Sequence, residues 1–85
     1  MNTDFTTVPP GELMMNMILE KDMNLNTIAD SLNLDLYNVR LLLKGELGID
    51  FNLAEKIYPI FGGSISYWLN KEQEYRKGVV NSQQN

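Results

Sequence analysis

Apolar residues recur at helical spacing along most of the chain, and polar or turn-forming residues separate the apolar stretches. The first stretch follows two prolines, and Pro10 can open a helix because the first helical residue needs no partner for its backbone N–H. The pattern predicts a first helix from about residue 10 to residues 20–22. Its apolar stripe consists of Leu13, Met14, Met17 and Ile18.

Two short helices are expected next, each with a recognisable start and end. Asn24 and Asp35 are N-cap candidates, because their side-chain oxygens can accept hydrogen bonds from the unpaired N–H groups of a first turn. Asn33 tolerates the left-handed conformation that ends a helix, and Gly45 is the corresponding stop of the next helix. The inner stripes are Ile28, Ala29 and Leu32 in one helix, and Val39, Leu42 and Leu43 in the other.

A fourth helix is predicted to begin after Asp50, which is its cap candidate. Pro59 lies within this helix and lacks a backbone donor, so the helix is expected to kink or to end early. Its stripe comprises Leu53, Ala54, Ile57, Ile60 and Phe61.

A fifth helix is expected after Gly62-Gly63, with Ser64 or Ser66 as its cap, and it should end near Lys77. Trp68 and Tyr75 are interpreted as its core anchors. The expected organisation is a flexible arm over residues 1–8, a helix-turn-helix domain over 9–77 and a flexible tail over 78–85.

Residues 24–43 have the packing requirements of a helix-turn-helix. Small Ala29 lets two helices cross closely, apolar Leu34 fills the turn, and Val39 packs back onto the preceding helix. The expected fold class is therefore all-α, a λ-repressor-like five-helix domain containing a helix-turn-helix. The second helix of such a unit normally enters the DNA major groove.

Composition narrows the chemistry that this domain can perform. The 85 residues include no cysteine and no histidine, which removes disulfides, thiolate zinc sites and the commonest general base and metal ligand. No catalytic constellation, cofactor site or metal site is apparent, and we do not expect an enzyme. The net charge of −4 means that any basic face for phosphate binding must be local.

The chain resembles the XRE-type helix-turn-helix family, in particular its plasmid-maintenance antidote branch, the HigA-like antitoxins. This resemblance covers about residues 9–75. It is carried by Pro10-Gly11-Glu12-Leu13, by Ala29, Leu32, Val39, Leu42, Leu43, Gly45, Gly48-Ile49 and Ala54, and by Phe61-Gly62, Ser64, Trp68-Leu69-Asn70 and Tyr75. It implies a dimeric DNA-binding autorepressor that neutralises a toxin.

The candidate DNA-binding residues lie on the outer side of the third helix: Tyr37, Asn38, Arg40, Leu41 and Lys44. Asn38 can pair with adenine, Arg40 with guanine or phosphate, and Tyr37 with a phosphate oxygen. Relatives usually carry Arg, Gln, Ser or Thr where this chain has Leu36 and Leu41, and leucine cannot pair with base edges. Leu36 could be half-buried, whereas Leu41 is expected to be exposed and to form an apolar strip with Tyr37.

Two functions follow from these residues. The first is a DNA-binding regulator of the antitoxin type, with duplex DNA and a toxin as partners, acting as a homodimer. The second is a protein-binding module on the same scaffold, whose partner would be a toxin, a polymerase or nuclease component, or a larger assembly such as a phage particle. No apolar run reaches the roughly 18 to 20 residues of a membrane span and no signal-peptide pattern is present, so we expect no membrane partner and a cytoplasmic location.

Overall fold

Five α-helices account for most of residues 8–83, the part of the chain that the computed structural model describes, with side chains described to residue 78. The helices are α1 (Pro10–Lys21), α2 (Leu25–Leu32), α3 (Leu36–Lys44), α4 (Phe51–Phe61) and α5 (Ile65–Gln83). This confirms the predicted all-α fold with five helices.

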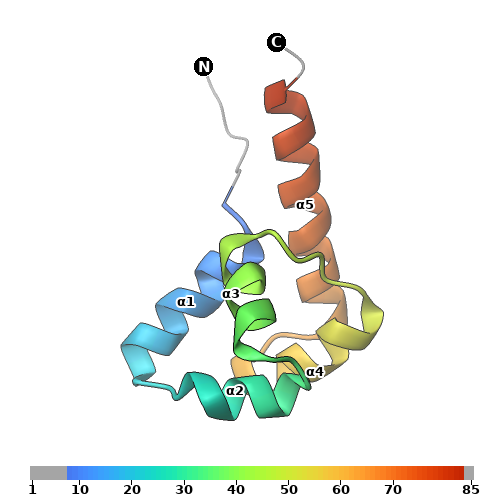
Figure 1. The fold of residues 1–85 in the computed structure, drawn as a ribbon. Helices are drawn as coiled ribbons and strands as arrows, with labels where there is room; N and C mark the ends of the chain where they lie inside the picture. The colour runs from blue at the N-terminus through green and yellow to red at the C-terminus, as the bar shows by residue number, and fades with distance from the viewer. Residues whose placement is uncertain (1–7, 84–85) are drawn as a thin grey trace.

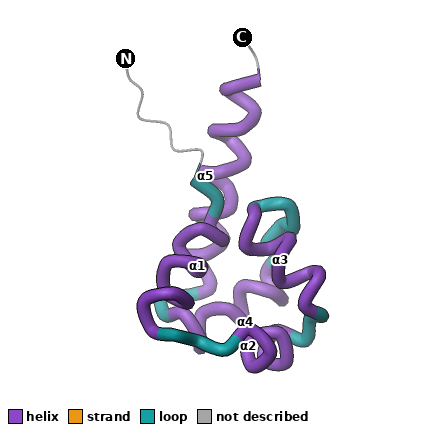
Figure 2. Tube along the Cα trace, turned by 60° about the vertical axis from the view of Figure 1, so that its left-hand side comes forward, coloured by secondary structure: helices purple, strands orange, loops and turns teal. Residues whose placement is uncertain are grey.

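The helices surround one core, and α5 extends beyond it. α3 packs against α1 and α2, α4 packs against α2 and α5, and α1 also contacts α5. Figures 1 and 2 show that the last turns of α5 project past the other four helices. The described chain consequently has principal extents of 40 × 24 × 23 Å.

The predicted caps form where the sequence places them. Asn24 Oδ1 accepts hydrogen bonds from the N–H groups of Asn26 and Thr27 at 2.8 and 3.1 Å. Asp50 Oδ1 accepts from the N–H of Leu53 at 2.9 Å, and Ser64 Oγ accepts from that of Tyr67 at 3.0 Å. The cap of α5 is therefore Ser64 and not Ser66. Each bond satisfies a donor that the first helical turn would otherwise leave unpaired.

The predicted helix stops also form. Asn33 ends α2 with φ 58°, and Gly45 ends α3 with φ 83°, both left-handed. Asp22 ends α1 in the same conformation, with φ 53°. Asx residues adopt this conformation more readily than most side chains, so α1 ends within the expected range without a glycine.

The ends of α4 and α5 differ from the prediction. α4 continues past Pro59 to Phe61, so of the two expected effects of the proline, a kink or an early end, the early end does not occur. Pro59 lies in the last turn, where it removes only the one hydrogen bond that would otherwise reach back four residues. α5 continues to Gln83 instead of ending near Lys77, because Gly78 costs a helix only about 1 kcal/mol and no proline follows it. The predictions for residues 1–7 and 84–85 lie outside the described residues.

The core is apolar throughout. Trp68 is fully buried, which confirms it as an anchor of α5, and its indole N–H donates to the carbonyl of Gly62 at 2.8 Å. Among the described residues no polar or charged side chain is buried. The other fully buried large side chains are Met14, Leu32, Leu42, Ile57 and Val39.

α1 and α3 approach each other closely in the core. A Cβ atom added at Gly11 would lie only 2.2 Å from the carbonyl oxygen of Leu42 and 2.6 Å from Cα of Leu43. These neighbours are backbone atoms of α3, so they cannot rotate away as a side chain would. Only glycine at position 11 allows the two helices to approach this closely.

We predict that Gly11→Ala destabilises the domain by about 3 kcal/mol, at the upper end of the range for overpacking. Alanine gains about 1 kcal/mol of helix propensity, which is too little to offset the clash. Urea unfolding followed by circular dichroism would measure the change. Gly48→Ala is the control, because its Cβ would meet only Glu72 Oε2, at an ordinary 3.5 Å. Equal stability of the Gly11→Ala variant and the parent would contradict this packing.

Candidate nucleic-acid interface

α3 presents one side to the core and the other to solvent. Its inner residues Val39 and Leu42 are each only 1% exposed. The turn before it is closed by a hydrogen bond from the N–H of Leu34 to the carbonyl of Ala29, at 2.9 Å. Ala29 is buried and Leu34 half-buried against the core, as the helix-turn-helix prediction requires.

Both ends of α3 are stabilised locally. At its start, Asp35 Oδ1 accepts a hydrogen bond from the N–H of Asn38 at 2.8 Å. At its end, the N–H of Gly45 bonds to the carbonyl of Leu42 at 3.1 Å, and that of Glu46 bonds to the carbonyl of Leu41 at 2.8 Å. These bonds satisfy the last carbonyls of the helix. The nine-residue helix is thus capped at both ends.

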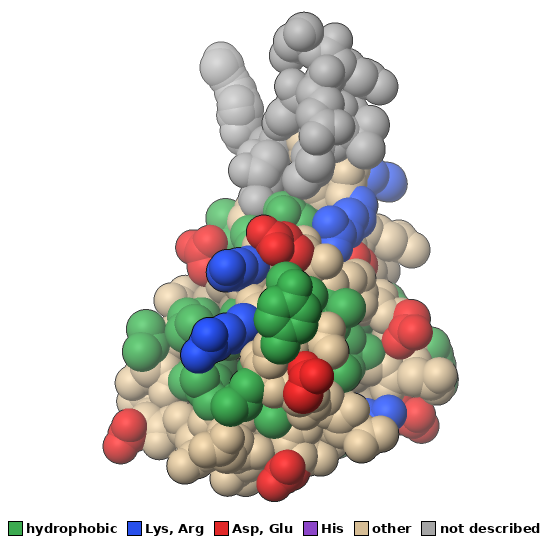
Figure 3. All heavy atoms as spheres, viewed as in Figure 1, with side chains coloured by type: hydrophobic (Ala, Val, Ile, Leu, Met, Phe, Trp, Pro, Cys, Tyr) green, Lys and Arg blue, Asp and Glu red, His purple; other side chains and the backbone are tan. Residues whose placement is uncertain are grey.

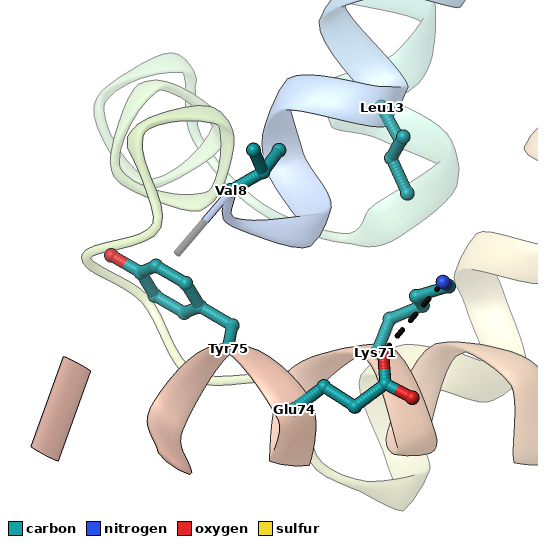
Figure 4. Close-up of a pocket in the computed structure, with 5 residues that line it drawn as sticks. All are labelled: Val8, Leu13, Lys71, Glu74 and Tyr75. Atoms are coloured by element: carbon teal, nitrogen blue, oxygen red, sulfur yellow. Dashed lines mark ion pairs between the residues drawn. The ribbon is translucent and has the colours of Figure 1, made fainter. Parts of the chain in front are cut away.

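Residues from outside the helix-turn-helix hold the end of α3 in place. A Cβ atom at Gly45 would lie 2.5 Å from Cβ of Pro9 and 3.0 Å from the hydroxyl oxygen of Tyr75. Figure 4 shows Tyr75 rising from α5 beneath Val8, with its hydroxyl directed toward the segment that follows α3. Tyr75 is only half-buried, so it supports this segment from the edge of the core rather than anchoring α5 within it. Spacing along the sequence could not reveal this contact, because Pro9, Gly45 and Tyr75 are far apart in the chain.

One turn earlier on α5, Glu72 lies beside the loop between α3 and α4. Its side chain is 13% exposed, and its Oε2 accepts a hydrogen bond from Arg76 Nε at 2.7 Å. The same oxygen would lie 3.5 Å from a Cβ at Gly48. The guanidinium of Arg76 in turn lies 4.9 Å from the centre of the Tyr75 ring. The side chain of Arg76 therefore makes its contacts within the fold, with Glu72 and with the ring of Tyr75.

The structure brings the five predicted site residues together on α3 with different exposures. Tyr37 is 68% exposed, Arg40 and Lys44 are exposed, and Asn38 is half-buried. Leu41 was expected to be exposed but is half-buried, because it borders the buried stripe and has Tyr37 and Lys44 as its neighbours one turn away.

Leu36 also differs from expectation. It is 40% exposed instead of half-buried, since it is the first residue of α3 and no preceding turn covers it. The apolar strip on this surface therefore consists of Leu36 and Tyr37 with only part of Leu41.

The basic side chains on this surface have no partner within the described chain. Arg40 and Lys44 make no ion pair or side-chain hydrogen bond to any described residue, and neither does the amide group of Asn38. The ion pairs found among residues 8–78 are both on α5, Lys71–Glu74 and Arg76–Glu72. Figure 3 shows basic side chains beside hydrophobic ones over α3, with acidic side chains around them. Over residues 34–50 the net charge is −1.

The small cleft between α1 and α5 shown in Figure 4 has a volume of about 90 Å³. This volume is smaller than that of a cavity of about 150 Å³ that binds benzene, and well below the roughly 300 to 1,000 Å³ of typical ligand pockets. Lys71 Nζ lies 3.7 Å from Glu74 Oε1 across its rim. Among the described residues no group of His, Cys, Asp and Glu side chains is arranged to hold a metal ion.

Comparison with known proteins gives no independent indication of family. No protein-family model matches this chain, and no curated protein shows significant similarity to it. None of the described helices combines the length and the apolar character needed to cross a bilayer.

We predict that Asp35→Ala lowers the free energy of unfolding by about 1 kcal/mol, because the N–H of Asn38 loses its acceptor. Asp35→Asn keeps an acceptor oxygen and should retain most of the stability. Chemical unfolding of the two variants measures the difference. The control is Asp30→Ala, which removes the same charge from an exposed residue whose side chain makes no hydrogen bond to a described residue. A loss for Asp30→Ala as large as that for Asp35→Ala would contradict the capping role.

Proposed function

We propose that this protein is a helix-turn-helix DNA-binding regulator of the antitoxin type. It would act in the cytoplasm as a dimeric autorepressor that also neutralises a toxin, and it would not be an enzyme. The observation that carries the proposal is the outer surface of α3, where the side chains of Asn38, Arg40 and Lys44 make no hydrogen bond or ion pair with any described residue. A rigid surface helix with unpaired donors is the element that such proteins insert into the major groove.

Each side chain has a role that follows from its chemistry. Arg40 would donate two hydrogen bonds to the N7 and O6 atoms of guanine, and the amide of Asn38 would pair with adenine. Lys44 and the hydroxyl of Tyr37 would contact phosphates on either side, which orients the helix without reading sequence. With only two cations on α3, affinity for one site would be modest and strongly dependent on salt.

A second copy of the chain would supply the remaining affinity. Helix-turn-helix proteins of this size bind two half-sites about 34 Å apart, which places two copies on one face of the DNA. The fourth and fifth helices are the proposed contact, because they lie outside the helix-turn-helix.

We expect Arg40→Ala and Lys44→Ala each to weaken binding to AT-rich duplex DNA and to reduce the slope of log K against log salt by roughly one. Fluorescence anisotropy at several salt concentrations, beginning at low salt, measures both quantities. Lys77→Ala is the matched control: it removes the same charge from an exposed residue on α5 that makes no ion pair with a described residue. If all three variants bind DNA as the parent does, or if the parent does not bind at low salt, the regulator proposal is wrong.

A protein-binding module on the same scaffold is the second candidate, and the exposure of Tyr37 favours it. At 68% exposed, with Leu36 at 40% beside it, Tyr37 places an apolar group where phosphates would have to approach. Tyrosine is enriched at the centres of protein interfaces, where its ring supplies contact area. The partner would be a toxin, a polymerase or nuclease component, or a subunit of a larger assembly such as a phage particle.

Under this second candidate, Tyr37→Glu should weaken binding to the purified product of the neighbouring gene at least tenfold, while DNA binding stays negligible. Tyr58→Glu is its control, since Tyr58 is 40% exposed on α4 and receives the same change. Isothermal titration calorimetry would measure the affinities. Equal affinities for the Tyr37→Glu variant and the parent would exclude α3 as the contact surface.

A further inference from the structure

A second surface of the molecule lies beside the starts of α3 and α4. There a cleft of about 250 Å³ opens between the helix-turn-helix turn, the loop after α3 and the first turns of α4. Four leucines from these segments line it, and polar side chains complete its wall. The leucines are Leu32, Leu34, Leu47 and Leu53, and the polar residues are Asn33, Asp50, Asn52 and Lys56.

The size of this cleft limits what it can hold. Ligand pockets for cofactors and drug-sized molecules usually measure about 300 to 1,000 Å³. A cavity of about 150 Å³ holds a benzene ring. The leucine-lined cleft, at about 250 Å³, is smaller than such pockets and large enough for one apolar side chain of leucine or phenylalanine size.

Two exposed apolar residues are close in sequence to residues that line the cleft. Phe51 lies between two lining residues, Asp50 and Asn52, and is 57% exposed. Leu36 follows the lining residue Leu34 by two positions and is 40% exposed. An apolar cleft beside exposed apolar side chains is typical of a surface that binds another protein.

The charge around the cleft indicates the chemistry of that protein. The residues that line it or directly adjoin the lining residues include four carboxylates and one cation. The carboxylates belong to Asp35, Glu46, Asp50 and Glu55, and the cation to Lys56. This surface repels phosphates and attracts lysine and arginine. It is chemically distinct from the outer side of α3, where Arg40 and Lys44 lie.

We propose that the cleft binds a segment of a partner protein that presents one leucine- or phenylalanine-sized side chain flanked by lysines or arginines. The apolar side chain enters the cleft between the leucines, and the flanking cations face the surrounding carboxylates. This interaction goes beyond the proposed DNA binding and uses different residues, so each can fail without the other.

The test uses the full chain and a defined probe. The probe is a 12-residue peptide with one central leucine flanked by lysines, in a background of serine and glycine. The control peptide replaces that leucine with serine and keeps the charge. In ¹⁵N–¹H correlation spectra, the leucine peptide should shift the amide signals of residues 32–34 and 47–56, and the serine peptide should bind at least threefold more weakly.

A second test of the proposal places a positive charge on the wall of the cleft. Asn52→Arg introduces a cation at the exposed start of α4 and should weaken binding of the leucine peptide at least threefold. Asn70→Arg makes the same change at an exposed position on α5 and should leave binding unchanged. Unaltered spectra elsewhere in the Asn52→Arg variant establish that it is folded.

Several results would overturn the proposal. Equal binding of the two peptides would show attraction by charge alone, and shifts outside the cleft would place the contact elsewhere. Cleft signals that move with protein concentration in the absence of peptide would identify a second copy of the chain as the occupant. DNA binding measured on the Asn52→Arg and Arg40→Ala variants separates failure of this proposal from failure of the regulator proposal.

Discussion

The position of α3 depends on how closely the start of the domain approaches it. Gly11 leaves no space for a side chain between α1 and the backbone at Leu42 and Leu43, and Pro9 fills the space beside Gly45. Tyr75 reaches the same place from α5. Three segments far apart in the chain thus meet where α3 ends. The outer surface of α3 can be a defined binding surface because the inner side of the helix packs against the backbone of α1 at Gly11, and its C-terminal end packs against the side chains of Pro9 and Tyr75.

The two surfaces next to α3 have opposite electrostatic character although they share one scaffold. The outer side carries Arg40 and Lys44 without internal partners, whereas the leucine-lined cleft has Asp50 in its wall and three further carboxylates next in sequence to lining residues. Two of these carboxylates, Asp35 and Asp50, also cap α3 and α4. Capping therefore places negative charge at the two helix starts that border the cleft. The requirement for stable helix ends and the selection of a basic partner are met by the same side chains.

Features that depend on neighbours in sequence were predictable, and features that depend on tertiary contact were not. The caps at Asn24, Asp35, Asp50 and Ser64 and the stops at Asn33 and Gly45 involve residues within one turn, so local chemistry determines them. The predicted exposures of Leu36 and Leu41 were wrong. Both residues lie at the border of the buried stripe, where the surrounding side chains determine how much of a residue is exposed. The leucine-lined cleft escaped prediction because residues 32–34 meet residues 47–56 only in the folded chain. The predicted end of α5 near Lys77 was wrong, because a single residue of low helix propensity, Gly78, does not end a long helix.

The apolar character of the interior has a consequence for how the molecule responds to its surroundings. Since no polar or charged side chain of the described residues is buried, the ion pairs found among them, Lys71–Glu74 and Arg76–Glu72, lie outside the core, where salt screens them and where such pairs contribute only about 1 kcal/mol or less. Changes in electrolyte concentration within the moderate range should leave the native population almost unaltered while they modulate attraction at the periphery. The packing of the core is in this way independent of most outer charges, and the exceptions are Asp35 and Asp50, whose carboxylates also cap α3 and α4.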